Sequence, residues 1–118
     1  MYPKHEKLLS DLAEKTAANS INWESSEVSD QFILKLKNGA ILFDKQATVA
    51  SGWDQDVEIY YSIKILNNVG GAIDEFDVER GNWHDVARTM YETIRRRIHR
   101  IDEQLDEIIR EIDSSDAN

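Results

Sequence analysis

The chain has 118 residues, 41% hydrophobic and 31% charged, with a formal net charge of −9 and no cysteine. This length suits one domain with a single core, here taken as residues 1–118. The lack of cysteine excludes disulfide frameworks, thiolate nucleophiles and cysteine-based metal sites, and the negative charge disfavours nucleic acid and anionic membranes as partners. Because the sequence shows neither a secretory leader pattern nor an apolar run of about 18 residues, we expect a cytoplasmic protein.

The N-terminal segment has the pattern of an amphipathic helix over residues 4–18. Apolar side chains recur at helical spacing from Leu8 onward, and Pro3 suits the first turn because its missing N–H would have no partner there. Trp23 is expected to anchor the polar loop that follows, over residues 24–30.

Residues 32–44 carry the strongest local signal, which predicts a β-hairpin. Apolar and polar residues alternate on both sides of Asn38-Gly39, a dipeptide that favours a two-residue turn with positive φ. A turn at these two residues places Leu34 opposite Phe43. The apolar side chains of both strands then share one face, which we expect to be core.

A second hairpin is predicted after a polar connection over residues 46–56. Residues 57–65 alternate, and the returning strand covers residues 72–78, with Gly70 in the left-handed position of the turn. The positions expected to face inward on the first strand are Val57, Ile59, Tyr61, Ile63 and Ile65. On the returning strand, if Ile73 pairs with Ile65 and faces inward, strand alternation turns Phe76 and Val78 away from the core unless a β-bulge intervenes.

The C-terminal segment predicts a long helix over residues 83–112, capped by Asn82 and followed by a polar tail over 113–118. Its apolar residues follow a heptad seam: Ala87, Tyr91, Ile94, Ile98, Ile101, Leu105, Ile108 and Ile112. Such a helix is roughly 45 Å long, whereas a domain of this size has a radius of gyration of about 13 to 14 Å. Either the N-terminal helix runs alongside the overhang or another chain covers it.

The element order predicts an α+β fold: an antiparallel four-stranded sheet made of two hairpins, with both helices covering one face. The sequence also resembles a loose group of small bacterial proteins of unknown function. The resemblance extends from Leu8 to Ile112 and rests on Ile21-Asn22-Trp23-Glu24, the two hairpins and the C-terminal helix. It implies the fold and no catalytic residues.

The only concentration of positive charge lies on the C-terminal helix, in Arg95-Arg96-Arg97 and Arg100, and acidic turns follow it. This charge pattern has three interpretations. The first is a solvated face of helical ion pairs, the second is a phosphate or RNA contact, and the third is antiparallel self-association, which would pair the basic middle with the acidic end of a second copy.

The remaining candidate sites are weaker. Asp54, Asp56 and Glu58 resemble half of a calcium loop but lack its central glycine. The three histidines have no zinc-binding spacing, and no segment predicts a metal or a cofactor. Trp53 and Tyr60 either pin loops to the core or form an exposed recognition surface.

We therefore expect a noncatalytic protein-protein interaction module, a homodimer that self-associates through the C-terminal helix. The alternatives are an acidic neutraliser of a basic protein, of antitoxin, immunity or secretion-chaperone type, and a metal-assisted hydrolase using the loop carboxylates. The candidate interaction residues are Trp53, Tyr60, Arg96, Arg97, Ile98, Arg100, Ile101, Leu105, Ile108 and Ile112.

Overall fold

The computed structural model describes residues 2–49, 57–79 and 81–116. In chain order the elements are α1 (Pro3–Ala17), β1 (Glu24–Ser25), β2 (Gln31–Leu36), β3 (Gly39–Val49), β4 (Val57–Asn67), β5 (Ala72–Val78) and α2 (Asn82–Asp116). The five strands in these ranges form one antiparallel sheet in the order β1-β2-β3-β4-β5. The α+β class is confirmed. The count of four strands is wrong, because the expected polar loop contains β1, whose Glu24 pairs with Ile33 at the sheet edge.

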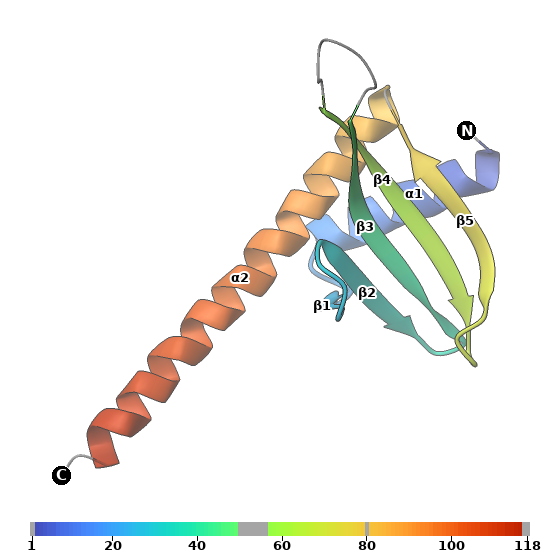
Figure 1. The fold of residues 1–118 in the computed structure, drawn as a ribbon. Coiled ribbons are helices and arrows are strands. Elements are labelled where there is room, and N and C mark those ends of the chain that lie inside the picture. The colour runs from blue at the N-terminus through green and yellow to red at the C-terminus, as the bar shows by residue number, and fades with distance from the viewer. Residues whose placement is uncertain (1, 50–56, 80, 117–118) are drawn as a thin grey trace.

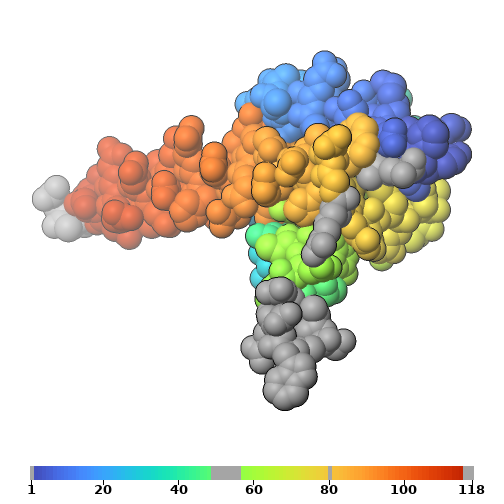
Figure 2. All heavy atoms as spheres, turned by 90° about the horizontal axis from the view of Figure 1, so that it is seen from above, coloured from blue at the N-terminus to red at the C-terminus, as the bar shows by residue number. Residues whose placement is uncertain are grey.

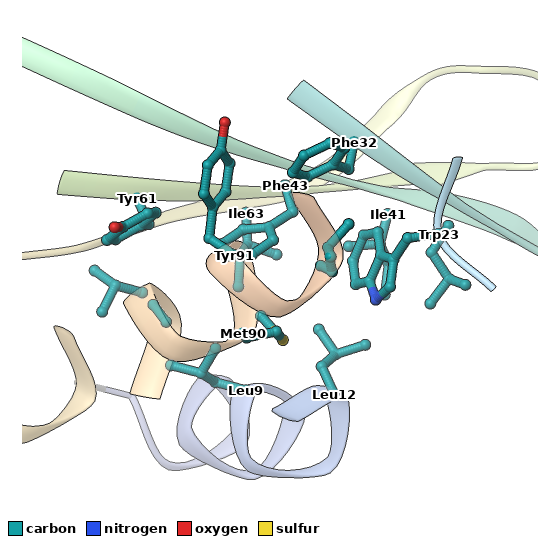
Figure 3. Close-up of a cluster of buried hydrophobic side chains, with 14 of the residues drawn as sticks. Leu9, Leu12, Trp23, Phe32, Ile41, Phe43, Tyr61, Ile63, Met90 and Tyr91 are labelled. Atoms are coloured by element: carbon teal, nitrogen blue, oxygen red, sulfur yellow. The ribbon is translucent and has the colours of Figure 1, made fainter. Parts of the chain in front are cut away.

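Both helices lie on one face of the sheet (Figure 1). In the close-up the first part of α2 lies between the strands and α1 (Figure 3). Tyr91 of α2 is the centre of the aromatic cluster, with ring centroids 5.0 Å from Phe32, 5.7 Å from Phe43 and 5.5 Å from Tyr61. The ring of Tyr91 therefore packs against three strands at once, and Leu9 of α1 covers the core from the other side of α2.

The first hairpin has a different register from the expected one. Leu36 pairs with Gly39, so the turn residues are Lys37 and Asn38, and Phe32 instead of Leu34 lies opposite Phe43. Neither turn residue has a positive φ. The error shifts one strand by two residues, and because side chains alternate with a period of two, the predicted core face is nevertheless the buried one.

The hairpin formed by β3 and β4 is longer than expected. β3 continues to Val49, through the first part of the predicted polar connection. Tyr61 and Ile63 are buried as predicted, but Val57 and Ile59 are exposed. The reason is the position of α2. Nε2 of His84, in the first turn of α2, lies 2.9 Å from the carbonyl oxygen of Ile59. The helix therefore begins beside Ile59 and does not extend over the start of β4.

A β-bulge resolves the parity of β5. Ile65 pairs with Asp74 and Leu66 with Ala72, which leaves Ile73 as the extra residue, 64% exposed. The bulge reverses the facing of the residues beyond it, and Phe76 is consequently buried. Gly70 has the expected left-handed conformation, with φ +85°.

Helix α2 is one continuous element of 35 residues. It begins at Asn82 itself and continues to Asp116, so the segment expected as a polar tail is mostly helical. At 1.5 Å per residue the helix is about 52 Å long. The radius of gyration is 17.5 Å, against the 13 to 14 Å or so of a compact domain of this length. Figure 2 shows the second half of α2 projecting from the body.

Candidate interaction surface

The projecting half of α2, residues 101–116, is called the arm here, and the segment before it, residues 94–100, is called its root. From Ile101 to Ser115 every side chain of the arm is exposed. Five aliphatic side chains lie along one edge of the arm, and each is between 50% and 57% exposed. This arm edge consists of Ile101, Leu105, Ile108, Ile109 and Ile112. The same seam is buried earlier in the helix, at Ala87, Tyr91 and Ile94.

The seam changes environment at the root because the body ends there. Ile94 is 2% exposed, Ile98 is partly buried against the core, and Ile101 is 53% exposed. A surface helix normally keeps one apolar stripe toward its own core. Here the stripe continues for about three turns beyond the last residue that the described body covers.

The charges of α2 divide at the same point. The root contains four arginines and no carboxylate, whereas the arm contains seven carboxylates and one arginine. Some side chains are paired along the helix. Nη2 of Arg95 lies 3.1 Å from Oε2 of Glu92, and Nε2 of His99 lies 3.2 Å from Oε1 of Glu103, a contact that is an ion pair only when the imidazole is protonated. Such exposed pairs stabilise a helix by only a few tenths of a kcal/mol. The predicted ion-paired face is thus present, but it does not involve the exposed apolar edge.

The root is fastened to the body by an arginine. The guanidinium of Arg97 donates hydrogen bonds to the backbone carbonyl oxygens of Thr16 and Ala17, at the C-terminal end of α1. Carbonyl groups at the end of a helix lack the usual intrahelical donor, and the carbonyl oxygen of Thr16 also accepts a hydrogen bond from the backbone N–H of Asn19. The guanidinium adds a second donor at this helix end and interacts favourably with the helix dipole. The point where the arm leaves the body is therefore defined by hydrogen bonds as well as by packing.

Two hollows flank the root. One, of about 290 Å³, is lined by Ile21 and Trp23 before β1 and by Arg97 and Arg100 of α2. The other, also about 290 Å³, lies on the opposite side of α2 and is lined by residues 25, 26 and 28–32, and by Tyr91, Arg95 and His99 among others. Ile98 lines both hollows, so the arm edge runs directly toward the point between them.

The structure brings only part of the predicted candidate set together. Ile101, Leu105, Ile108 and Ile112 share the arm edge, and Arg96 and Arg100 are exposed at the root. Arg97 and Ile98 are partly buried, the first by its contacts with α1 and the second by the core.

The two aromatic candidates are not part of this surface. Tyr60 is partly buried, and the strand alternation places it on the sheet face away from the helices, since Tyr61 faces the core. Trp53 lies outside the described residues. Sequence reasoning also missed Ile109, which is 55% exposed beside Ile108. Its position four residues after Leu105 was the available signal, but a strict heptad seam leaves it out.

The carboxylates proposed for metal chemistry do not form a described site. Asp54 and Asp56 lie outside the described residues, and Glu58 is exposed. Among the residues that the structure places, no group of three or more histidine, aspartate and glutamate side chains could hold a metal ion. His5 contacts Asp74 with Nε2 and Oδ2 2.7 Å apart, and this hydrogen bond lowers the pKa of the Asp74 carboxyl.

The uncovered face of the sheet carries a second group of carboxylates. Burial raises the pKa of Asp44, and the charges of Glu75 and Asp77 raise it further, while a 2.6 Å hydrogen bond from Gln46 opposes the shift. Ser62 pairs with both Asp44 and Asp77 across the strands. This face is thus acidic and open, and it lies on the opposite side of the sheet from α2.

Comparisons of the chain with family models, with curated proteins and with solved structures find no match. The resemblance to a group of small bacterial proteins stays a prediction from sequence. Neither helix of the described chain has the length and apolar character needed to cross a bilayer.

Proposed function

We propose that the protein is a noncatalytic interaction module that self-associates through the arm edge of α2. One observation carries the proposal: a line of five half-exposed aliphatic side chains on a helix that extends past its own core. Contiguous apolar surface of this kind, bordered by charged residues, typically marks a protein-protein contact.

The size of the edge is sufficient for a specific contact between two copies. Five half-exposed side chains on each of two arms bury on the order of 1,000 Å² in total when they meet, which is the lower limit for a specific interface. The 4-3-4 spacing of Ile101, Leu105, Ile108 and Ile112 is the spacing that lets two helices interlock their side chains. A second helix with the same spacing is therefore a suitable partner.

The test is the mass of the full chain in solution. Sedimentation equilibrium between about 1 and 100 µM should show the mass rising from 13.6 kDa toward twice that value. Leu105→Asp should weaken the association at least tenfold or so, because each dimer loses two apolar contacts and gains two charges in the interface. Since Leu105 is 50% exposed and lies outside the core, the variant should keep the wild-type helical circular dichroism.

Arg110→Gln is the matched control, because it makes the charge of the arm more negative by the same unit on the outer side of the arm, away from the arm edge. It should associate nearly as well as the wild type. A chain that stays monomeric at 100 µM, or a Leu105→Asp variant that dimerises like the wild type, would contradict the proposal.

A second candidate, the acidic neutraliser of a basic protein, is supported by the carboxylates on the uncovered sheet face, including Asp44, Glu75 and Asp77. An acidic surface attracts and orients a basic partner. The two candidates use different surfaces. If the second is correct, Leu105→Asp should leave the capture of a basic protein intact.

A further inference from the structure

The arm has two features that together restrict how a second copy can pair with it. Its four seam residues are separated by 4, 3 and 4 positions, a spacing that is identical when it is read from either end. Its charge is not symmetric, because the arginines gather at the root and the carboxylates gather along the arm.

The symmetric spacing permits an antiparallel pair in which every layer is filled. Ile101 of one copy then lies opposite Ile112 of the other, and Leu105 lies opposite Ile108. The two-fold axis passes between residues 106 and 107, so that the four layers are related in pairs, as a self-complementary interface requires. The same spacing would also fill a parallel pair, so apolar contacts alone do not select the direction.

The charges select it. In a parallel pair the acidic arms would lie side by side along their whole length, and the arginines of the two roots would also face each other. In the antiparallel pair each acidic end lies beside the basic root of the other copy. In the register given above, Arg100 of one copy lies level with residue 113 of the other. Glu111 of that second copy is two residues away along its helix and lies on the same flank of the interface. Like charges held close together destabilise an interface, and opposite charges set its orientation.

The root also provides space for the end of a second arm. In this register Ser115 of one copy is level with Ile98 of the other, between the two hollows that flank the root. The hollow beside Trp23 and Ile21 continues the apolar edge, and Arg97 and Arg100 form its charged side. The overlap therefore reaches the body of the second copy without requiring the buried residue Ile94 to be exposed.

We propose that two copies of this chain pair through antiparallel arms, with the acidic end of each arm seated at the arginine-lined hollow of the other's root. This inference rests on the proposed self-association and adds the direction, the register and the second contact surface. It makes Trp23, Arg97 and Arg100 part of the interface, although they lie outside the exposed apolar edge.

Because the chain has no cysteine, single cysteines report the direction directly. Full-length Ile101→Cys and Ile112→Cys, one of them carrying a mass tag, are mixed and mildly oxidised. The antiparallel pair should give a mixed disulfide between the two variants and little disulfide from either one alone. Leu105→Cys with Ile108→Cys is a second pair with the same expectation and tests the register independently.

The outcomes separate the two proposals. Dimers that form disulfides only between identical positions would overturn the antiparallel direction and leave self-association standing. Dimers by mass that form no disulfide in either mixture would overturn the register. A monomer at every concentration would instead overturn the proposed self-association, and the antiparallel pair with it.

Charge reversal provides a second readout that does not depend on cysteine. Arg100→Glu should weaken dimerisation roughly five- to tenfold, and adding Glu111→Arg in the same chain should restore most of the loss. Arg110→Glu is the control, because it changes the net charge equally but lies on the outer side of the arm. Equal weakening by Arg100→Glu and Arg110→Glu, with no restoration by Glu111→Arg, would contradict the proposed contact.

Discussion

At the scale of single residues, a buried hydrogen bond fastens the segment after α1 to the core. Nε1 of Trp23 donates to Oγ1 of Thr16 at 3.0 Å, and both residues are almost fully buried. The sequence predicted an anchoring role for Trp23, and this burial confirms it. The position of its acceptor, seven residues earlier, depends on how the chain turns at Asn19, whose φ is +57°.

Thr16→Val tests this bond, because it keeps the shape of the side chain and removes the acceptor. The indole N–H is then buried without a partner, which should lower the free energy of unfolding by about 1–3 kcal/mol in urea denaturation. Thr93→Val removes a hydroxyl that donates to the carbonyl of Thr89 in its own helix, and it should change the stability by about 0.5 kcal/mol or less. Equal effects would show that the bond to Trp23 has no special weight.

Tyr91 gives the protein a defined response to alkaline pH. Burial, with a contribution from the charge of Asp30, raises the pKa of its phenol to about 12, from an ordinary value of 10.0. The folded state therefore holds this proton more tightly than the unfolded state. The stabilisation is complete below about pH 10 and should be lost as the pH rises toward 12.

Urea denaturation at several pH values between about 9 and 11.5 should show stability falling across this range. Tyr91→Phe should reduce the slope, although Tyr61, whose pKa burial also raises, contributes in the same direction. The variant also loses a 3.1 Å hydrogen bond from the phenol to the carbonyl of Asp30, which should cost about 1 kcal/mol at neutral pH. An unchanged slope in Tyr91→Phe would rule out this residue as the source.

At the scale of elements, the first hairpin depends on a glycine for a reason other than its turn. A Cβ at Gly39 would lie 2.1 Å from the backbone carbonyl oxygen of Leu66 on β4. The requirement is therefore close approach of two strands, and not a positive φ, which Gly39 does not have. Sequence reasoning assigned Gly39 to the turn because Asn-Gly is common there, and that assignment shifted the register.

Gly39→Ala should force the ends of β3 and β4 apart and lower the free energy of unfolding by about 1–3 kcal/mol. Lys37→Ala, in the exposed turn next to it, should change the stability by less than about 0.5 kcal/mol. Chemical denaturation of both variants gives the comparison. A tolerated alanine at residue 39 would show that the strands can separate there at little cost.

The other elements show which patterns are reliable. The strand over residues 72–78 was predicted with its observed bounds, because alternating residues follow a glycine turn. The sequence indicated a β-bulge only if Ile73 was to face inward opposite Ile65. The bulge is present, but Ile65 pairs with Asp74, and alternation along one strand does not show which residue is its partner. The exposure of Val57 and Ile59 could not be predicted, because alternation does not show where the covering helix begins.

At the scale of the whole molecule, the dominant feature is the asymmetry between a packed body and a projecting helix. The extents are 60 × 44 × 27 Å, and the longest is comparable to the length of α2 alone. The body and the root contain the core and most of the lining of the two hollows, while the arm contributes no buried side chain among the residues described. Stability and interaction are therefore located in different parts of the chain, which is why Leu105→Asp is expected to affect association and not folding.

The sequence by itself determined the α+β class, the core face of the strands, and the long heptad-patterned helix from residue 83 onward. These features follow from the periodicity of apolar residues, which is a local property of the order of residues along the chain. Only the tertiary structure decided where that helix leaves the body, because the seam from Ala87 to Ile112 is uniform in sequence and its burial stops at the root. The reason is geometric: the sheet and one 15-residue helix cover about half of the 35-residue helix, and the remainder stays exposed whatever its pattern.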